Sequence, residues 1–280
     1  MLRTPAPLKG ALGCLIRMNN GIPIAEMPSA IFEAAQRRMW DCTVGFVRVE
    51  KTRNVERAIL LGSGVLVRAG ERRAILTADH VRNILSTTGR IGLVLSQSEE
   101  TTNIDAGALA PNKLGRGTND AEGPDLAVLH VAPLLAGALS SKKTFYNLSN
   151  RQDLLLGNAP DPHAGIWAAN GFVEELTIPE ASSTPEKTVT AFCQFAAFGG
   201  VENYQEREGH DYYDFPFEEA GDIPRNFGGV SGSGLWQFVL RYNVSAPSTT
   251  YLQSADHRRM AGRVIPAGAR FSACRLGPGQ

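Results

Sequence analysis

Neither sign of charge is in excess in this sequence, because its 28 lysines and arginines are balanced by 28 aspartates and glutamates. A neutral chain has no electrostatic footprint for nucleic acid or an anionic membrane, so we expect neither as a partner. Long apolar runs are also missing, since no segment approaches the roughly 20 residues of a membrane-spanning helix. The apolar patch at residues 10–16 is interrupted by glycines and lacks the long core of a signal peptide. These absences predict a cytoplasmic location.

Cysteine is scarce, and the few that occur show no pairing pattern. They are Cys14, Cys42, Cys193 and Cys274. Their spacing matches no zinc motif, and the histidines of the chain add no metal-ligand spacing. We therefore expect free thiols in a reducing compartment, no metal site and no cofactor.

The most informative segment is Gly229-Val230-Ser231-Gly232-Ser233-Gly234. A serine on a tight turn between glycines can face a substrate together with the backbone N–H groups beside it, as a nucleophile requires. Taken alone, such a run is more often a flexible turn, and Ser231 and Ser233 are rival candidates. A second run of this kind, Gly62-Ser63-Gly64, is expected to be a strand whose glycines permit close backbone approach.

Two upstream segments supply the partners that a serine nucleophile needs. One is an apolar, strand-like run that ends in small residues and carries His80 at its tip; the other is an alternating strand that Asp125 opens after a Gly-Pro break. Asp79 is a rival to Asp125, but the side chains of neighbouring residues usually project apart. Histidine, aspartate and serine follow one another in the chain order of one of the convergent Ser-His-Asp arrangements.

These three segments resemble the signatures of the chymotrypsin/trypsin-like serine proteases. The resemblance implies that His80 is the general base, that Asp125 orients it, and that Ser231 is the nucleophile. It also implies an oxyanion hole formed by the backbone N–H groups of Gly229 and Ser231.

The resemblance extends from about Thr43 to Trp236 and therefore covers most of the chain. Ser233 stands where relatives often have glycine, which favours Ser231 as the nucleophile. Val81 stands where many secreted relatives have a cysteine. The sequence is in this respect closer to intracellular bacterial members of the family than to secreted ones.

Many short strand-like runs between turn residues predict an all-β fold, and the resemblance implies the trypsin-like double β-barrel. We expect an N-terminal tail and short helix in residues 1–39, a first barrel in 40–135 and a second barrel with a C-terminal tail in 136–280. Strands are expected near residues 43–49, 58–67, 73–77, 91–96, 166–176, 188–198, 235–242 and 258–264. Residues 97–124 are expected to form a surface excursion, and residues 204–219 a solvated loop with a strand edge.

Three features depart from the family pattern. Val230 precedes the nucleophile where secreted relatives have an aspartate that pairs with a newly cut N-terminus, so activation through that ion pair is excluded. Arg225 falls where the floor of the specificity pocket would lie, which predicts cleavage after acidic residues. Residues 271–280 read as an irregular tail, so we expect an unusual or incomplete pocket wall.

The sequence thus predicts a serine endopeptidase that cleaves protein or peptide substrates through an acyl-enzyme intermediate without a cofactor. Two alternatives stay open. The first is a catalytically weak or latent module that binds peptides or proteins, or that an activating partner protein switches on; the intact triad argues against it, and the unusual C-terminus argues for it. The second is an esterase with the same triad, although the α/β-hydrolase kind places serine first in the chain.

Overall fold

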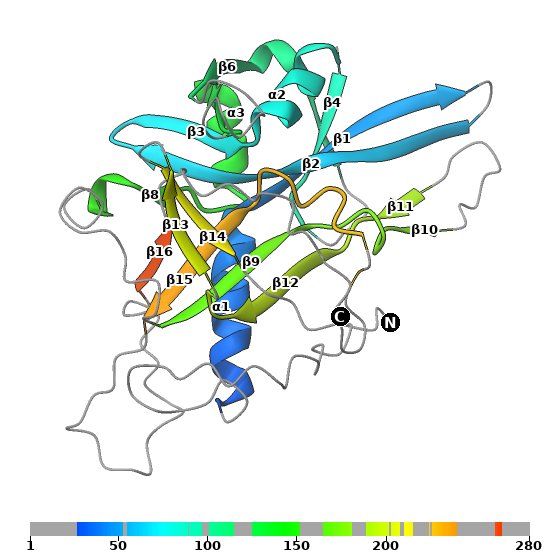
Figure 1. The fold of residues 1–280 in the computed structure, drawn as a ribbon. Helices are drawn as coiled ribbons and strands as arrows, with labels where there is room; N and C mark the ends of the chain where they lie inside the picture. Colours follow the sequence, from blue (N-terminus) through cyan, green and yellow to red (C-terminus); the bar gives the residue numbers. More distant parts are fainter. Residues whose placement is uncertain are drawn as a thin grey trace.

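The structure of the chain is a computed structural model (Figure 1). It describes residues 27–52, 55–88, 90–96, 101–114, 125–151, 165–180, 189–201, 203–207, 210–214, 224, 226–239 and 261–264. Within these ranges strands dominate and α-helices are few, so the predicted all-β class is confirmed in this coarse form. The closure of two barrels and the division into domains stay predictions.

The larger sheet contains eight strands among the described residues and curls strongly (Figure 1). They are β1 (Thr43–Thr52), β2 (Val55–Ala69), β3 (Arg72–Thr77), β4 (Arg90–Val94), β5 (Thr101–Asp105), β6 (Leu109–Lys113), β7 (Ala127–Val131) and β8 (Tyr146–Asn147). Their order across the sheet is β5-β4-β1-β2-β3-β7-β6, with β8 parallel to β2. Successive side chains of a strand point to opposite faces, so alternate residues such as Val44 and Phe46 are buried in the core.

The second sheet brings together segments from the later part of the chain. It runs β12 (Gln194–Gly199), β9 (Ile166–Phe172), β15 (Gly234–Val239) and β16 (Ala261–Val264), with every pair antiparallel. Two hairpins accompany it, namely β10 (Ile178–Glu180) with β11 (Val189–Ala191) and β13 (Asn203–Arg207) with β14 (His210–Asp214). β15 begins where the glycine- and serine-rich segment ends, so the candidate turn enters this sheet directly.

The three α-helices of the described residues are α1 (Ser29–Cys42), α2 (Asp79–Ser86) and α3 (Pro133–Ser140). Short 3-10 turns occupy residues 106–108 and 149–151. α1 buries Ala35, Met39 and Cys42 in a cluster that also contains Val65 of β2 and Trp236 of β15. The helix therefore seals the junction of the two sheets with its apolar side.

Several local expectations were wrong. His80 does not end a strand but is the second residue of α2, because the extended run stops at Thr77. The expected excursion 97–124 contains β5 and β6, and the expected strand 188–198 is divided into β11 and β12. The segment 204–219, expected as a solvated loop with a strand edge, contains most of β13 and all of β14, and Tyr213 is buried with its ring 5.0 Å from that of Trp167. Residues 271–280 lie outside the described residues.

The described cysteines are free thiols, of which Cys42 is buried and Cys193 half-buried. Burial raises the pKa of the Cys42 thiol to about 12, so this sulfur stays protonated at neutral pH. Cys14 and Cys274 lie outside the described residues. In the part of the chain that the structure describes, no helix is long and apolar enough to cross a membrane.

A series of buried hydrogen bonds joins the two sheets to α1. Trp236 Nε1 donates to Asn170 Oδ1 over 2.8 Å, and Asn170 Nδ2 donates to Thr43 Oγ1 over 2.6 Å. The Thr43 hydroxyl in turn donates to the carbonyl of Met39 in the last turn of α1, over 2.8 Å. Trp236, Asn170 and Thr43 are all fully buried. Removing the partner of any polar atom in this series would lower the stability of the protein, because the atom would stay buried without a hydrogen bond.

We expect Asn170→Ala to lower the free energy of unfolding by about 2–4 kcal/mol, since it leaves the indole N–H of Trp236 buried without an acceptor. Chemical denaturation measures the change. The matched control is Asn203→Ala, which removes an exposed asparagine whose amide donates to Asp214. The control should change stability by no more than about 0.5 kcal/mol, and an equal loss in both variants would contradict the prediction.

Candidate active site

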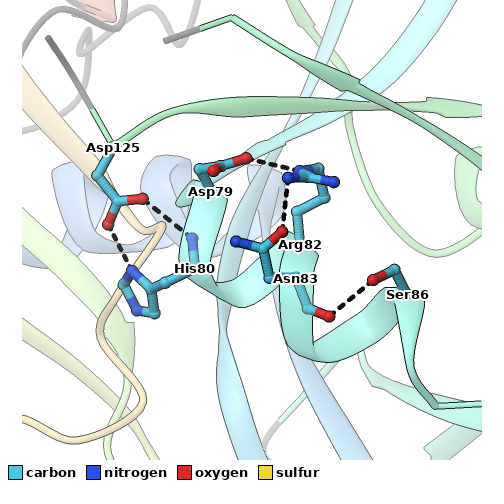
Figure 2. A network of polar contacts seen from close by, with 6 residues as sticks. All are labelled: Asp79, His80, Arg82, Asn83, Ser86 and Asp125. Atoms are coloured by element: carbon cyan, nitrogen blue, oxygen red, sulfur yellow. Dashed lines mark hydrogen bonds and ion pairs between the residues drawn. The ribbon is translucent and has the colours of Figure 1, made fainter. Parts of the chain in front are cut away.

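His80 and Asp125 meet although 45 residues separate them in the sequence (Figure 2). His80 lies at the start of α2, and Asp125 lies just before β7, which pairs with β3 beside it. The His80 ring hydrogen-bonds through Nδ1 to Asp125 Oδ2, and the backbone N–H of His80 donates to Asp125 Oδ1 over 3.0 Å. Both carboxylate oxygens are therefore used to hold one histidine.

This contact sets the charges of both groups. The hydrogen bond from Asp125 raises the pKa of His80 above 6.5, against the opposing effect of burial. Burial opposes the charged form of Asp125, but the hydrogen bonds from the His80 ring and backbone outweigh it and lower the pKa of that carboxyl. Asp125 thus stays ionised beside an imidazole that protonates readily. The His80 side chain keeps 43% of its surface exposed, so its ring remains open to a reactant.

Asp79, the rival partner, points elsewhere. Its buried carboxylate accepts a hydrogen bond of 2.6 Å from Nε of Arg82, one turn along α2 (Figure 2). Its charge contributes less than that of Asp125 to the raised pKa of His80. Of the two aspartates, Asp125 makes the hydrogen bond with the imidazole.

The segment before β15 folds into two consecutive turns that require glycine. Gly229 and Gly232 have φ values of +90° and +84°, a region that residues with a side chain rarely adopt. A Cβ on Gly232 would also lie 2.4 Å from the Ser63 carbonyl oxygen and 2.7 Å from the backbone nitrogen of Ala78. The turn is therefore packed directly against the end of β3 and against Ala78, which lies two residues before His80.

Ser231 lies close to the same junction. Its carbonyl accepts a 2.8 Å hydrogen bond from the N–H of Ser63 in β2. A Cβ on Gly62 would lie 2.6 Å from the side chain of Val81 and 3.1 Å from the Ser231 carbonyl oxygen. Gly62 therefore lies between the Ser231 carbonyl and the side chain of Val81, the residue after His80, and Ser231 itself is half-buried. Among the described residues, no hydrogen bond joins the Ser231 hydroxyl to the His80 ring.

Ser233 occupies a different environment from Ser231. Its side chain packs against Gly171 of β9, and its Oγ is buried with no hydrogen-bond partner among the described residues. A hydroxyl enclosed in this way is out of reach of a substrate. The sequence could not separate the two serines by spacing, because the difference arises from the pairing of β15 with β9.

The carbonyls of the turn are held by hydrogen bonds. Gly228 accepts from the N–H of Glu174 over 2.8 Å, and Val230 accepts from the N–H of Ser233 over 2.9 Å. A trans peptide points its carbonyl and the next N–H in opposite directions. These bonds therefore direct the N–H groups of Gly229 and Ser231 away from the protein atoms that hold the carbonyls. Among the described residues, neither N–H has an acceptor.

Val230 is buried in an apolar cluster with Val173 and Phe195. An aliphatic side chain thus anchors the turn at the position where the family pattern has a carboxylate. Arg225, the predicted floor of the specificity pocket, lies outside the described residues. Within the described part of the chain, no three histidine, cysteine or carboxylate side chains gather as metal ligands.

Two contributors to the site were not expected from the sequence. Ser63 contacts the turn from β2, and Glu174 holds it from the segment after β9. The glycines on either side of Ser63 were a usable signal, because they indicated close backbone approach at this point. No sequence signal marked Glu174, since the contact is made by its backbone.

We expect Gly232→Ala to destabilise the protein by more than about 3 kcal/mol, because the new methyl group would meet backbone atoms in addition to the strain of a positive φ. Gly70→Ala is the matched control: Gly70 has a φ of +58° and nothing within 4 Å of the added methyl group. The control should lower the free energy of unfolding by only about 1–2 kcal/mol. Urea unfolding compares the two, and similar losses would contradict the tight approach at Gly232.

We expect the pKa of His80, measured by NMR titration of its ring, to lie above 6.5 and to fall in Asp125→Asn. The direction follows because the variant loses the charge that favours imidazolium, while burial continues to lower the pKa. Asp79→Asn should lower it less, since that charge is the weaker contributor. A larger fall in Asp79→Asn would identify Asp79 as the partner instead.

Comparisons with known proteins give little beyond this geometry. Neither a scan against protein-family models nor a search of curated proteins found a match. A search of solved structures found, among others, the crystal structure of the serine endoprotease from Yersinia pestis, which is 16% identical with a TM-score of 0.39. The match covers 78% of this chain and 60% of the Yersinia chain, so the chain spans less than two thirds of that protease. At this level of similarity, arguments about function rest on the site itself.

Proposed function

We propose that the chain is a serine endopeptidase of the trypsin-like kind, in which Ser231 is the nucleophile, His80 the general base and Asp125 its orienting partner. The observation that carries the proposal is the hydrogen bond between the His80 ring and Asp125. A carboxylate on Nδ1 leaves Nε2 unprotonated in the neutral ring, so Nε2 can accept a proton. The approach of the Ser231 backbone to Gly62 and Ser63, with Gly62 packed against Val81 at the start of α2, supports Ser231 as the proton donor.

The reaction would proceed in two halves. Ser231 Oγ loses its proton to His80 Nε2 and forms a bond with the carbonyl carbon of the substrate peptide. The N–H groups of Gly229 and Ser231 would stabilise the negative oxygen of the tetrahedral intermediate, and each such donor is commonly worth about 10²–10³ in rate. The C–N bond then breaks and His80 gives its proton to the leaving amine. Water, deprotonated by His80, then attacks the ester carbonyl carbon, the bond from this carbon to Ser231 Oγ breaks, and His80 returns the proton to Ser231 Oγ.

The turn would reach this arrangement without the ion pair that secreted relatives use. Val230 is held by apolar contacts, and the carbonyls of Gly228 and Ser231 are held by backbone donors. This supports a site that needs no newly cut N-terminus. The preference for acidic residues through Arg225, the protein or peptide substrate, an activating partner and the cytoplasmic location stay predictions.

We expect a fluorophosphonate probe to label the purified chain, and we expect Ser231→Ala to abolish the labelling. The probe reacts with an activated serine hydroxyl, and His80→Ala should slow the reaction by about 10²–10⁴-fold because the base is lost. Gel fluorescence and intact-mass measurement report the adduct.

Ser233→Ala is the matched control, since it removes a hydroxyl that is two residues away but buried. It should keep the labelling of the unchanged chain. Labelling that survives in Ser231→Ala would contradict the assignment of the nucleophile. An unchanged chain that resists the probe would instead favour the latent, peptide-binding alternative. Turnover of a peptide amide compared with a simple ester separates an endopeptidase from an esterase.

A further inference from the structure

One residue of the first sheet, Ser63, holds the turn on both sides of Val230. Ser63 Oγ donates to the carbonyl of Gly229 over 2.7 Å. The N–H of Ser63 donates to the carbonyl of Ser231 over 2.8 Å. These two carbonyls belong to the two residues whose N–H groups lack acceptors among the described residues. The segment that carries both N–H groups is thus fixed to β2 at two points.

Ser63 is itself held in place. Its hydroxyl accepts a 2.9 Å hydrogen bond from the N–H of Phe172 at the end of β9, and its carbonyl accepts a 2.7 Å bond from the hydroxyl of Thr77. Its side chain is fully buried. Because Phe172 N–H donates to Ser63 Oγ, the hydroxyl proton is left to donate to Gly229. The direction of this hydrogen bond is therefore determined by the surroundings.

The glycines beside Ser63 make these contacts possible. A Cβ on Gly62 would lie 2.6 Å from Val81, and one on Gly64 would lie 2.5 Å from Ile75. β2 can therefore approach both the end of β3 and the turn only with glycine at these two positions. Thr77, which holds the Ser63 carbonyl, stands three residues before His80. Ser63 thus connects the segment that carries His80 with the segment that carries Ser231.

We propose that Ser63 is a positioning residue for the oxyanion site, because its hydroxyl fixes the carbonyl of the Gly229–Val230 peptide, which lies between the two peptides that carry the N–H groups of Gly229 and Ser231. The inference rests on the proposed function for its effect on the reaction. The contacts themselves are independent of that function. Without the hydroxyl, the Gly229 carbonyl and the Phe172 N–H lose their shared partner. The turn then samples orientations in which the two N–H groups do not face the substrate.

The test compares Ser63→Ala with Thr43→Val, using saturable labelling by the same fluorophosphonate. Thr43 is the matched control because its hydroxyl is equally buried and makes two hydrogen bonds, to Met39 and Asn170, but none to the turn. We expect Ser63→Ala to lower the maximal labelling rate by about 10–100-fold, less than the 10²–10³ for removal of a whole donor. The half-saturating probe concentration and the pH midpoint should stay unchanged, because the His80–Asp125 pair is intact. Thr43→Val should keep the rate of the unchanged chain.

A second measurement tests the positioning role of Ser63 even if the fluorophosphonate does not label the chain. Amide hydrogen exchange by NMR should show faster exchange at Val230, whose N–H donates to the Phe227 carbonyl, in Ser63→Ala but not in Thr43→Val. An unlabelled but folded wild type would overturn the proposed nucleophile, and this exchange result would still test Ser63. The positioning role is overturned if exchange at Val230 and the maximal rate match the wild type in Ser63→Ala, or if both variants lose rate equally.

Discussion

The glycine turn before β15 depends on one constraint. Each of its carbonyls must accept a hydrogen bond, while the N–H groups of Gly229 and Ser231 stay without a protein acceptor among the described residues. Glu174 supplies the donor for Gly228, Ser63 supplies donors for Gly229 and Ser231, and Ser233 supplies the donor for Val230. An unpaired carbonyl between two packed sheets would be costly. The rest of the site follows from this arrangement, since the same bonds keep β2, β9 and the turn in fixed positions.

Hydrogen bonding and burial have opposite effects on the pKa values of His80 and Asp125. Burial disfavours charge on both His80 and Asp125, yet the hydrogen bonds between them raise the pKa of one and lower that of the other. The pair therefore favours the ionised form of each group, which suits a base that must carry a proton briefly. Asp79 is buried beside the pair, but its Oδ1 makes an ion pair with Arg82 of the same helix, α2.

Apolar packing anchors the turn at Val230. Val230 packs with Val173 and Phe195, so the turn is anchored from the side of the second sheet. α1 packs against β15 itself, where Met39 and Trp236 share one cluster. Hydrophobic contacts carry no dependence on pH or on a free amine. This is consistent with a turn whose position is independent of chain cleavage.

The residue order itself indicated Ser-His-Asp chemistry, which stays a proposal, because a histidine after an apolar strand, an aspartate opening a strand and a serine between glycines are local patterns. The strands β1, β2, β3 and β15 were also predictable, since alternation and glycine spacing are local properties. α2 was not predicted, because the eight residues are a short helix, although Val81, Ile84 and Leu85 have helical spacing. Of the hairpin β13–β14 only a strand edge was predicted, and its Tyr213 packs against Trp167, a contact between distant segments. The sequence had favoured Asp125 over Asp79 and Ser231 over Ser233, but the hydrogen bonds of Asp125 to His80, the burial of Ser233 and the hydrogen bonds of Ser63 to the turn depend on strand pairing. Such pairings join residues far apart in the chain, and no local pattern encodes them.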